Sequence, residues 1–264
     1  MLEVKSIHKT FNKGTVDEKK ALNGLSLTLK EGDFVTVIGG NGAGKSTLLN
    51  ALAGVWPVDE GDIIIDGINV TFMPEFKRAK FLGRVFQDPM MGTAADMGID
   101  ENLALAARRG KFRGLSQGIS HKEREGYKEL LKTLDLGLED RITSKVGLLS
   151  GGQRQAVTLL MATLKKPKLL LLDEHTAALD PKTAAKVLET TNKVVNEHNL
   201  TTLMITHNMK DAIATGNRLI MMNNGQIVLD IEGEKKKSLT VDDLLHQFAL
   251  VSGEEFNNDR ALLA

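Results

Sequence analysis

The sequence predicts an α/β fold built on a mostly parallel β-sheet, with an antiparallel β part and an inserted α-helical subdomain. Apolar runs of strand length, at 34–38, 169–172 and 203–205, alternate with stretches of helical period. Leu25, Leu27 and Leu29 alternate with polar residues, which is typical of a half-buried antiparallel strand. Residues 89–150 instead favour helices with polar or glycine-rich connections, as expected of an insertion between strands.

In chain order, the first elements are strands at 2–11, 25–29, 34–38, 63–65 and 83–86. The run 34–38 is apolar throughout, as in a central strand covered on both faces. It leads into a helix that ends at Gly54, and Pro57 and Gly61 mark the loop that follows. Helices are expected at 100–109 and 122–135, with a loop at 110–120 between them.

The next predicted helix, 152–165, stops before Pro167 and precedes the strand at 169–172. Asp180 and Pro181 begin another helix, with Asp180 as the N-cap. After the strand at 203–205 come a short helix at 208–215 and a hairpin of 218–222 with 226–231. Thr240 opens a capping box that starts a final short helix before an irregular tail.

Composition limits the classes of function. Lys plus Arg and Asp plus Glu number 34 each, so no basic surplus argues for nucleic acid. The chain has no cysteine, which excludes disulfides and cysteine zinc sites. No apolar run approaches the roughly 18 residues of a membrane helix, so we expect membrane work to require a partner.

The sequence Gly39-Gly40-Asn41-Gly42-Ala43-Gly44-Lys45-Ser46-Thr47 lies where a predicted strand turns into a helix. Glycines there let consecutive backbone N–H groups surround phosphate oxygens, and the helix N-terminus adds partial positive charge. Lys45 is expected to reach the β- and γ-phosphates and Ser46 to place its hydroxyl on Mg²⁺. The pattern predicts a phosphate loop; the alternative is an ordinary strand-turn-helix junction.

Asp173 and Glu174 end the apolar strand 169–172. Behind a phosphate loop, such a pair predicts that Asp173 holds the Mg²⁺ water shell and that Glu174 faces the attacking water. Without that loop, adjacent acids are usually a solvated strand end.

Leu149-Ser150-Gly151-Gly152-Gln153 opens the helix at 152–165 with a second anion-binding N-terminus. A single nucleotide already has its phosphate cradle, so the second cradle indicates a second subunit. A plain N-cap is the alternative.

Taken together, these motifs resemble the nucleotide-binding subunit of an ABC transporter, and the resemblance covers essentially the whole chain. It implies an ATPase domain over 1–264, with a nucleotide-binding core at 1–88 and 151–232. Residues 89–150 form the helical signature subdomain and 233–264 a C-terminal extension. The implied ligands are ATP and Mg²⁺. The implied assembly is a head-to-tail dimer that sandwiches two ATP molecules.

The resemblance also implies a role for each matching residue. Glu174 is the general base, His207 holds the γ-phosphate and the water, and Gln87 contacts Mg²⁺ and water. Phe11 stacks on adenine, although core packing is the alternative for a strand aromatic, and Asp180 lies in the dimer-contact loop. The residues expected to bind nucleotide are Phe11, Gly39, Asn41, Gly42, Ala43, Gly44, Lys45, Ser46, Thr47, Ser150, Gly151, Gly152, Gln153 and Asp180; those for the metal are Ser46, Gln87 and Asp173.

Three places depart from the pattern of such subunits. Gly40 stands where Pro or Ser is frequent, His175 where Pro is frequent, and Thr158-Leu159-Leu160-Met161 lacks a frequent second arginine. None of these changes removes a catalytic part, so an active ATPase is expected. His8, His121, His198 and His246 have no motif around them and are interpreted as surface residues, not metal ligands.

The implied function is energy coupling: ATP binding closes the dimer, closure drives a separate multispan permease, and hydrolysis resets it. The absence of membrane helices favours an importer, with a substrate-binding protein as an indirect partner. The chain is then expected in the cytoplasm, bound to the inner face of the cell membrane through its permease. The subgroup resembles those that accompany branched-chain amino-acid permeases, so an amino acid, aromatic ones included, is the expected cargo.

The alternative is a soluble ABC ATPase of an assembly or repair machine. Met90 and Met91, directly after Gln87-Asp88-Pro89, are either a buried plug or a permease-docking surface.

Overall fold

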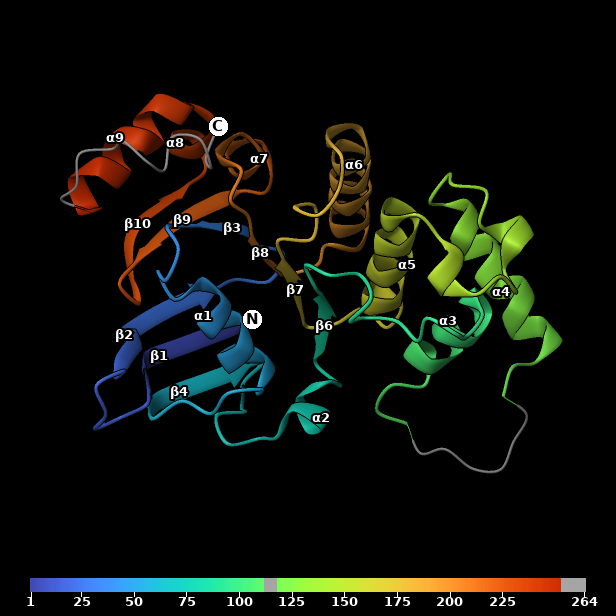
Figure 1. Ribbon diagram of the computed structural model, residues 1–264, viewed down its shortest axis with the longest axis horizontal. Coiled ribbons are helices and arrows are strands. Elements are labelled where there is room, and N and C mark those ends of the chain that lie inside the picture. Colours follow the sequence, from blue (N-terminus) through green and yellow to red (C-terminus); the bar gives the residue numbers. More distant parts are fainter. Residues whose placement is uncertain (112–117, 253–264) are drawn as a thin grey trace.

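The computed structural model describes residues 1–111 and 118–252, and within them the chain forms two β-sheets with helices around them (Figure 1). The larger sheet has the strand order β10-β9-β3-β8-β7-β6. Its strands are β3 (Phe34–Ile38), β6 (Leu82–Val85), β7 (Leu169–Asp173), β8 (Thr202–Ile205), β9 (Arg218–Asn223) and β10 (Gln226–Glu232). Every neighbouring pair is parallel except β9 with β10, which form the predicted hairpin.

The second sheet is the antiparallel part, in the order β2-β1-β4-β5 among the described residues. It consists of β1 (Leu2–Phe11), β2 (Lys19–Leu29), β4 (Glu60–Ile65) and β5 (Ile68–Asn69). Apolar side chains of β1, β2 and β4 pack with those of β3 in one buried cluster. The predicted fold class, a mostly parallel sheet with an antiparallel part, is confirmed.

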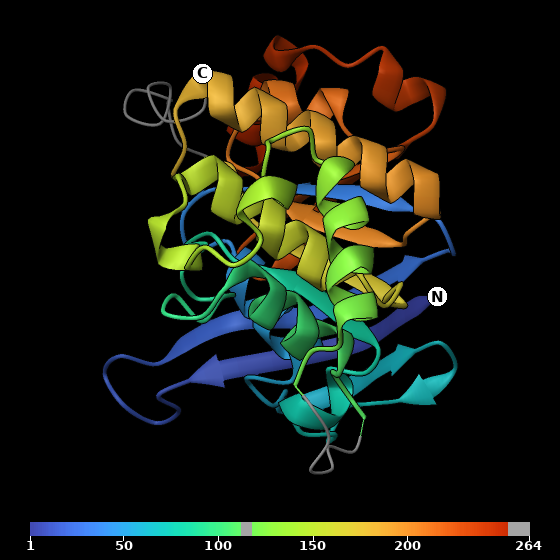
Figure 2. The ribbon, with the colours of Figure 1, turned by 90° about the vertical axis from the view of Figure 1, so that its right-hand side faces the viewer.

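A separate group of helices lies at one end of the molecule, away from the antiparallel sheet (Figure 1). It contains α3 (Ile99–Ala107), α4 (His121–Lys132), η1 (Glu139–Arg141), η2 (Val146–Leu148) and one face of α5 (Gly151–Thr163). These elements share their own apolar cluster, which includes Leu103, Leu131 and Val157. Figure 2 looks onto this end and shows α4 and α5 in front of the sheets.

The remaining helices cover the larger sheet. They are α1 (Lys45–Ala53), α6 (Pro181–His198), α7 (Met209–Ala214), α8 (Glu234–Lys237) and α9 (Val241–Ser252), with the short α2 (Glu75–Arg78) before β6. Among residues 1–111 and 118–252, no helix combines the length and the apolar character needed to cross a membrane.

The structure extends the predicted elements in a few places. Strand β2 begins at Lys19, ahead of the predicted 25, because Lys19 and Lys20 pair with the end of β1 and the apolar alternation starts later. The short elements β5, α2, η1, η2 and α8 were not predicted, since two to four residues carry too little periodicity. Part of the predicted loop at 110–120 and the predicted tail lie outside the described residues.

Candidate functional site

The predicted phosphate loop connects β3 to α1 at the carboxyl edge of the parallel strands. Gly44, the N-cap of α1, has φ 100°, and a Cβ there would lie 2.4 Å from the carbonyl oxygen of Ala21. Only glycine fits both requirements. Within the described residues no side chain caps α1, so the N–H groups of its first turn are left to bind an anion.

Lys45 is almost fully buried beside this loop. Its Nζ donates hydrogen bonds to the carbonyl oxygens of Gly39 (2.6 Å) and Gly40 (3.1 Å). Burial lowers the pKa of the ammonium, while the nearby Glu174 and Asp173 carboxylates act in the opposite direction. The lysine is therefore held at the loop by bonds that a phosphate can replace.

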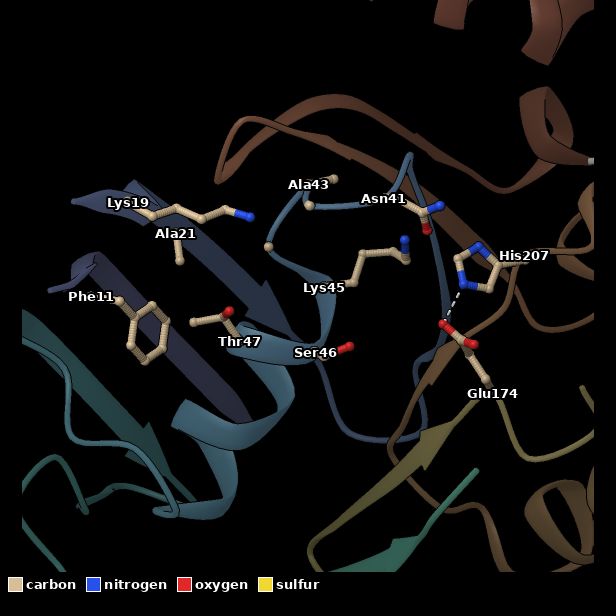
Figure 3. A pocket seen from close by; sticks show the side chains of 12 residues that line it. Phe11, Lys19, Ala21, Asn41, Ala43, Lys45, Ser46, Thr47, Glu174 and His207 are labelled. Atoms are coloured by element: carbon tan, nitrogen blue, oxygen red, sulfur yellow. Dashed lines mark ion pairs between the residues drawn. The ribbon is translucent and has the colours of Figure 1, made fainter. Parts of the chain in front are cut away.

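Residues of four predicted motif segments line one cavity of about 240 Å³ above the loop. Figure 3 shows Phe11 and Lys19 at one end of it, His207 and Glu174 at the other, and Lys45 and Ser46 between them. The lining residues are Phe11, Lys19, Ala21, Asn41, Gly42, Ala43, Gly44, Lys45, Ser46, Thr47, Glu174 and His207.

Phe11 ends β1 at the mouth of this cavity. It is half-buried and meets Trp56 edge-on, with ring centroids 5.0 Å apart and an interplanar angle of 81°. Lys9 Nζ lies over the ring, 5.5 Å from its centroid, and the ring lines the cavity, which disfavours the core alternative. Lys19 pairs with Phe11 across the β1–β2 ladder and lines the same cavity. Sequence reasoning missed Lys19, because its position depends on strand register.

Glu174 and His207 lie at the ends of the neighbouring strands β7 and β8. Glu174 Oε1 and His207 Nε2 are 2.5 Å apart, so these two predicted catalytic side chains are in direct contact. Glu174 adopts the left-handed conformation, with φ 45°, and its N–H donates to the carbonyl oxygen of Ile205 at 3.1 Å. This turn of the backbone directs the carboxylate away from the strand and into the cavity.

Asp173 and Gln87 line a second, larger cavity of about 640 Å³. Burial raises the pKa of the Asp173 carboxyl, and Arg84, whose Nη2 is 3.6 Å from Asp173 Oδ2, opposes this effect. Arg84 Nη2 also donates to Asn50 Oδ1 at 2.8 Å. No sequence signal had marked Arg84 as a neighbour of the acid pair, since the contact joins β6 to β7.

Ser150 caps helix α5, as the N-cap alternative expected. Its Oγ accepts a hydrogen bond from the Gln153 N–H at 3.3 Å, and Gln153 Oε1 accepts from the Ser150 N–H at 3.2 Å. Gly152 packs against α6, where a Cβ would lie 2.1 Å from Thr183 Cγ2. Residues 150–153 line neither cavity described above, so the structure does not bring them to the phosphate loop of the same chain.

Asp180 caps α6 by accepting a hydrogen bond from the Thr183 N–H at 3.1 Å. Hydrogen bonds from Thr183 hold the pKa of this carboxyl below its ordinary value. Asp180 is thus near Gly152 in space, because both residues contact Thr183, but it does not line the cavity of the phosphate loop.

The histidines without motifs are exposed, namely His121, His198 and His246, or half-buried, namely His8. His175 is different: it is buried, and its Nε2 lies 3.0 Å from Thr191 Oγ1 on α6. Burial lowers its pKa from 6.5 to about 4. The structure describes no group of three His, Cys, Asp or Glu residues positioned to hold a metal.

Met90 and Met91 are exposed, at 42% and 70%, so they do not form a buried plug. Met91 also lines the 640 Å³ cavity and a neighbouring one of about 430 Å³ beside α5.

The comparisons with known proteins agree with these features. Residues 22–177 match the family described as ABC transporter. A tyrosine transport ATP-binding protein of Clostridioides difficile (strain R20291) is 45% identical over 94% of this chain and 98% of its own. The xylose/arabinose import ATP-binding protein XylG of Sulfolobus acidocaldarius is 34% identical over 95% of each chain.

Solved structures resemble the fold over similar lengths. The ADP conformation of MJ1267, an ATP-binding cassette of an ABC transporter, has a TM-score of 0.77 and 27% identity over 95% of this chain and 98% of that one. The dimeric structure of MJ0796, a bacterial ABC transporter cassette, has a TM-score of 0.74 and 31% identity over 88% and 98%. The chain therefore belongs to the ABC transporter family, as an ATP-binding and ATP-hydrolysing subunit.

Proposed function

We propose that this chain powers a membrane permease that imports an amino acid, with tyrosine or a related aromatic amino acid as the cargo. The observation that carries this assignment is the 45% identity, over nearly the full length of both chains, to a tyrosine transport ATP-binding protein. A methionine import ATP-binding protein of Bartonella henselae, at 34% identity over 86% of this chain, gives weaker support for the same class of cargo.

In the proposed site, the phosphates of ATP lie on the loop from Gly39 to Thr47. The uncapped N-terminus of α1 faces them, and Lys45 exchanges its carbonyl partners at Gly39 and Gly40 for the β- and γ-phosphates. The adenine ring then stacks on Phe11, at the far end of the same cavity.

The donor set of Ser46, Gln87 and Asp173 fits Mg²⁺. It offers oxygen atoms and a single carboxylate, and Mg²⁺ commonly binds one or two carboxylates together with substrate phosphates. When bound, Mg²⁺ neutralises the charge on the β- and γ-phosphate oxygens. Arg84 Nη2, 3.6 Å from Asp173 Oδ2, forms an ion pair with this carboxylate.

We assign Glu174 as the general base and His207 as the residue that holds the γ-phosphate and the attacking water. The carboxylate and the imidazole are in contact at 2.5 Å at the γ-phosphate end of the cavity. A water that takes the place of His207 at the carboxylate is within reach of Glu174 for proton abstraction. His207 keeps the carboxylate in place when the water is absent.

The second half of each site comes from a second copy of the chain. Ser150, Gly151, Gly152, Gln153 and the nearby Asp180 are accordingly proposed to serve the partner's nucleotide. Their position away from the cavity of their own phosphate loop and the exposure of Ser150 support this arrangement. So does the likeness to a cassette solved as a dimer.

We further propose that the permease docks on the exposed Met90–Met91 segment and its adjacent cavities, which places the chain at the inner face of the membrane. Both cavities are lined by Phe86 and Met91, next to Gln87. The proposed organisation of the chain has three parts: a nucleotide-binding core formed by 1–88 and 151–232, a helical signature subdomain at 89–150, and a C-terminal extension at 233–264. A substrate-binding protein would act through the permease.

The catalytic assignment is tested with Glu174→Gln, which keeps the shape of the side chain and removes the base. We expect turnover to fall by about 10²- to 10⁴-fold while ATP binding persists, so that an ATP-bound dimer accumulates in size-exclusion chromatography with light scattering. Glu189→Gln, on an exposed side chain of α6, is the matched control for charge. A Glu174→Gln variant that stays monomeric with Mg-ATP and hydrolyses it normally contradicts the assignment.

The cargo is tested separately. The chain is reconstituted with its permease in liposomes, and ATP-dependent uptake of labelled tyrosine is compared with that of leucine and xylose. Uptake of xylose in preference to both amino acids contradicts the proposed class.

A further inference from the structure

We propose that Phe248, on the C-terminal helix α9, is a positioning residue that supports the phosphate loop from behind and disfavours a side chain at position 40. The inference rests on the proposed role of that loop in binding ATP. It assigns part of the nucleotide site to the C-terminal extension, outside the core motifs.

Helix α9 packs against the larger sheet through its apolar side chains. Thr240 Oγ1 accepts a hydrogen bond from the Asp243 N–H at 3.2 Å, and Asp243 Oδ2 accepts from the Thr240 N–H at 2.9 Å. From this capping box, Leu244 and Phe248 point inward one helical turn apart. Both are buried in a cluster with Ile38, the last residue of β3 before the loop. In Figure 1, α9 lies with α7 and α8 beside β9 and β10.

The edge of the Phe248 ring reaches the loop at Gly40. A Cβ on Gly40 would lie 3.1 Å from Phe248 Cζ, closer than ordinary van der Waals contact, and within 4 Å it would meet no other residue of the described chain. Gly40 is not among the residues with positive φ, so its backbone conformation is open to any residue. A side chain here would therefore have to displace the Phe248 ring or the loop by a few tenths of an ångström, and the backbone itself sets no barrier.

This contact is coupled to Lys45. The carbonyl oxygens of Gly39 and Gly40 are the two acceptors of the Lys45 Nζ, so a displacement of Gly40 moves the cation that is to bind phosphate. Displacing a charged group by fractions of an ångström weakens its bonds to the ligand. Phe248 is thus expected to affect the affinity for ATP, and with it KM, and not the chemical step.

The test is a double-mutant cycle in the full chain with Gly40→Ala and Phe248→Leu. Leu keeps an apolar side chain in the α9 cluster but withdraws the ring edge from Gly40. We measure the Kd for ATP by calorimetry, together with KM and kcat. Each single variant is expected to raise Kd and KM with kcat little changed, and the coupling between the two substitutions is expected to be at least about twofold in Kd, the lower end for residues in contact. In the double variant, the methyl group introduced at position 40 fits the vacated space, so Kd is lower than the product of the single effects predicts.

Strictly multiplicative effects on Kd, or a Phe248→Leu variant that lowers kcat and leaves KM unchanged, overturn the proposal. Because Gly40→Ala alters only the loop, it keeps the test valid if variants of α9 fold poorly.

Lys45→Ala is measured in parallel. If Lys45→Ala leaves ATP affinity intact, the phosphate-loop assignment itself fails; if it weakens binding while the cycle is multiplicative, only the role of Phe248 fails.

Discussion

The buried histidine beside the proposed general base gives a pH dependence of stability that can be worked out from the structure. Thr191 Oγ1 donates its one hydrogen to the Val187 carbonyl oxygen at 2.9 Å, so it accepts from His175 Nε2. His175 therefore carries a proton on Nε2. Burial lowers its pKa to about 4, against 6.5 in an unfolded chain.

The sign of the effect follows from proton binding. Between pH 6.5 and about 4 the unfolded chain holds the proton of His175 and the folded chain does not, so the free energy of unfolding falls as the pH falls through this window. Each pKa unit corresponds to about 1.4 kcal/mol. The loss is about 2 kcal/mol between pH 7 and pH 5, and about 3 kcal/mol when complete at pH 4.

The assay is urea unfolding of the isolated subunit, without nucleotide, from pH 7.5 to pH 5. Other groups also titrate, so the parent is compared with His175→Gln, which keeps a donor near Nε2 and cannot be protonated. The difference between the two curves should grow by about 2 kcal/mol toward pH 5. Thr191→Val is the control, because it removes the hydrogen bond but leaves His175 buried and titratable. Parallel curves for the parent and His175→Gln would refute the reasoning.

Three further predictions follow from the site. Lys45→Ala should weaken ATP binding by the single chain, whereas Ser150→Arg should leave it intact and abolish dimerisation and turnover; calorimetry and light scattering separate the two. Gly44→Ala should destabilise the fold by about 1 to 2 kcal/mol and lose ATP binding, because its φ is 100° and its Cβ would lie 2.4 Å from a backbone oxygen; urea unfolding measures the first effect. Met90→Asp with Met91→Asp should leave the melting temperature and ATP binding unchanged, since both side chains are exposed, but prevent co-purification with the permease.

Each of these has a matched control or a contrary outcome. Equal losses of affinity in the Lys45 and Ser150 variants contradict the two-subunit site. Gly67→Ala is the control for Gly44→Ala. Gly67 also has a positive φ, 76°, but a Cβ there would meet no described atom within 4 Å. An equal loss of stability in both variants would mean that the backbone conformation, and not the close contact, causes the destabilisation. Leu250→Asp, 66% exposed on α9, should not disturb permease binding, and retained assembly of the double Met variant counts against docking.

Much of the architecture was predictable because the responsible signals are local. Strand β3 and strand β7 are uninterrupted apolar runs, and the N-caps Ser150 and Asp180 act on N–H groups three residues away. The hairpin of β9 and β10 turns at Asn224 and Gly225, both in the left-handed conformation. Strand β2 was placed too late because Lys19 and Lys20 carry no apolar alternation; their pairing is set by β1.

The sequence by itself determined which residues are proposed to carry chemistry, because glycines before Lys45 and acids after an apolar strand indicate the same chemistry wherever the strand lies. Only the tertiary structure decided what these residues touch. Glu174 meets His207 because β7 and β8 are parallel neighbours, and Phe248 meets Gly40 because α9 packs behind β3. Such contacts depend on strand order and helix packing, which arise from burial of the whole apolar core and leave no local pattern in the chain.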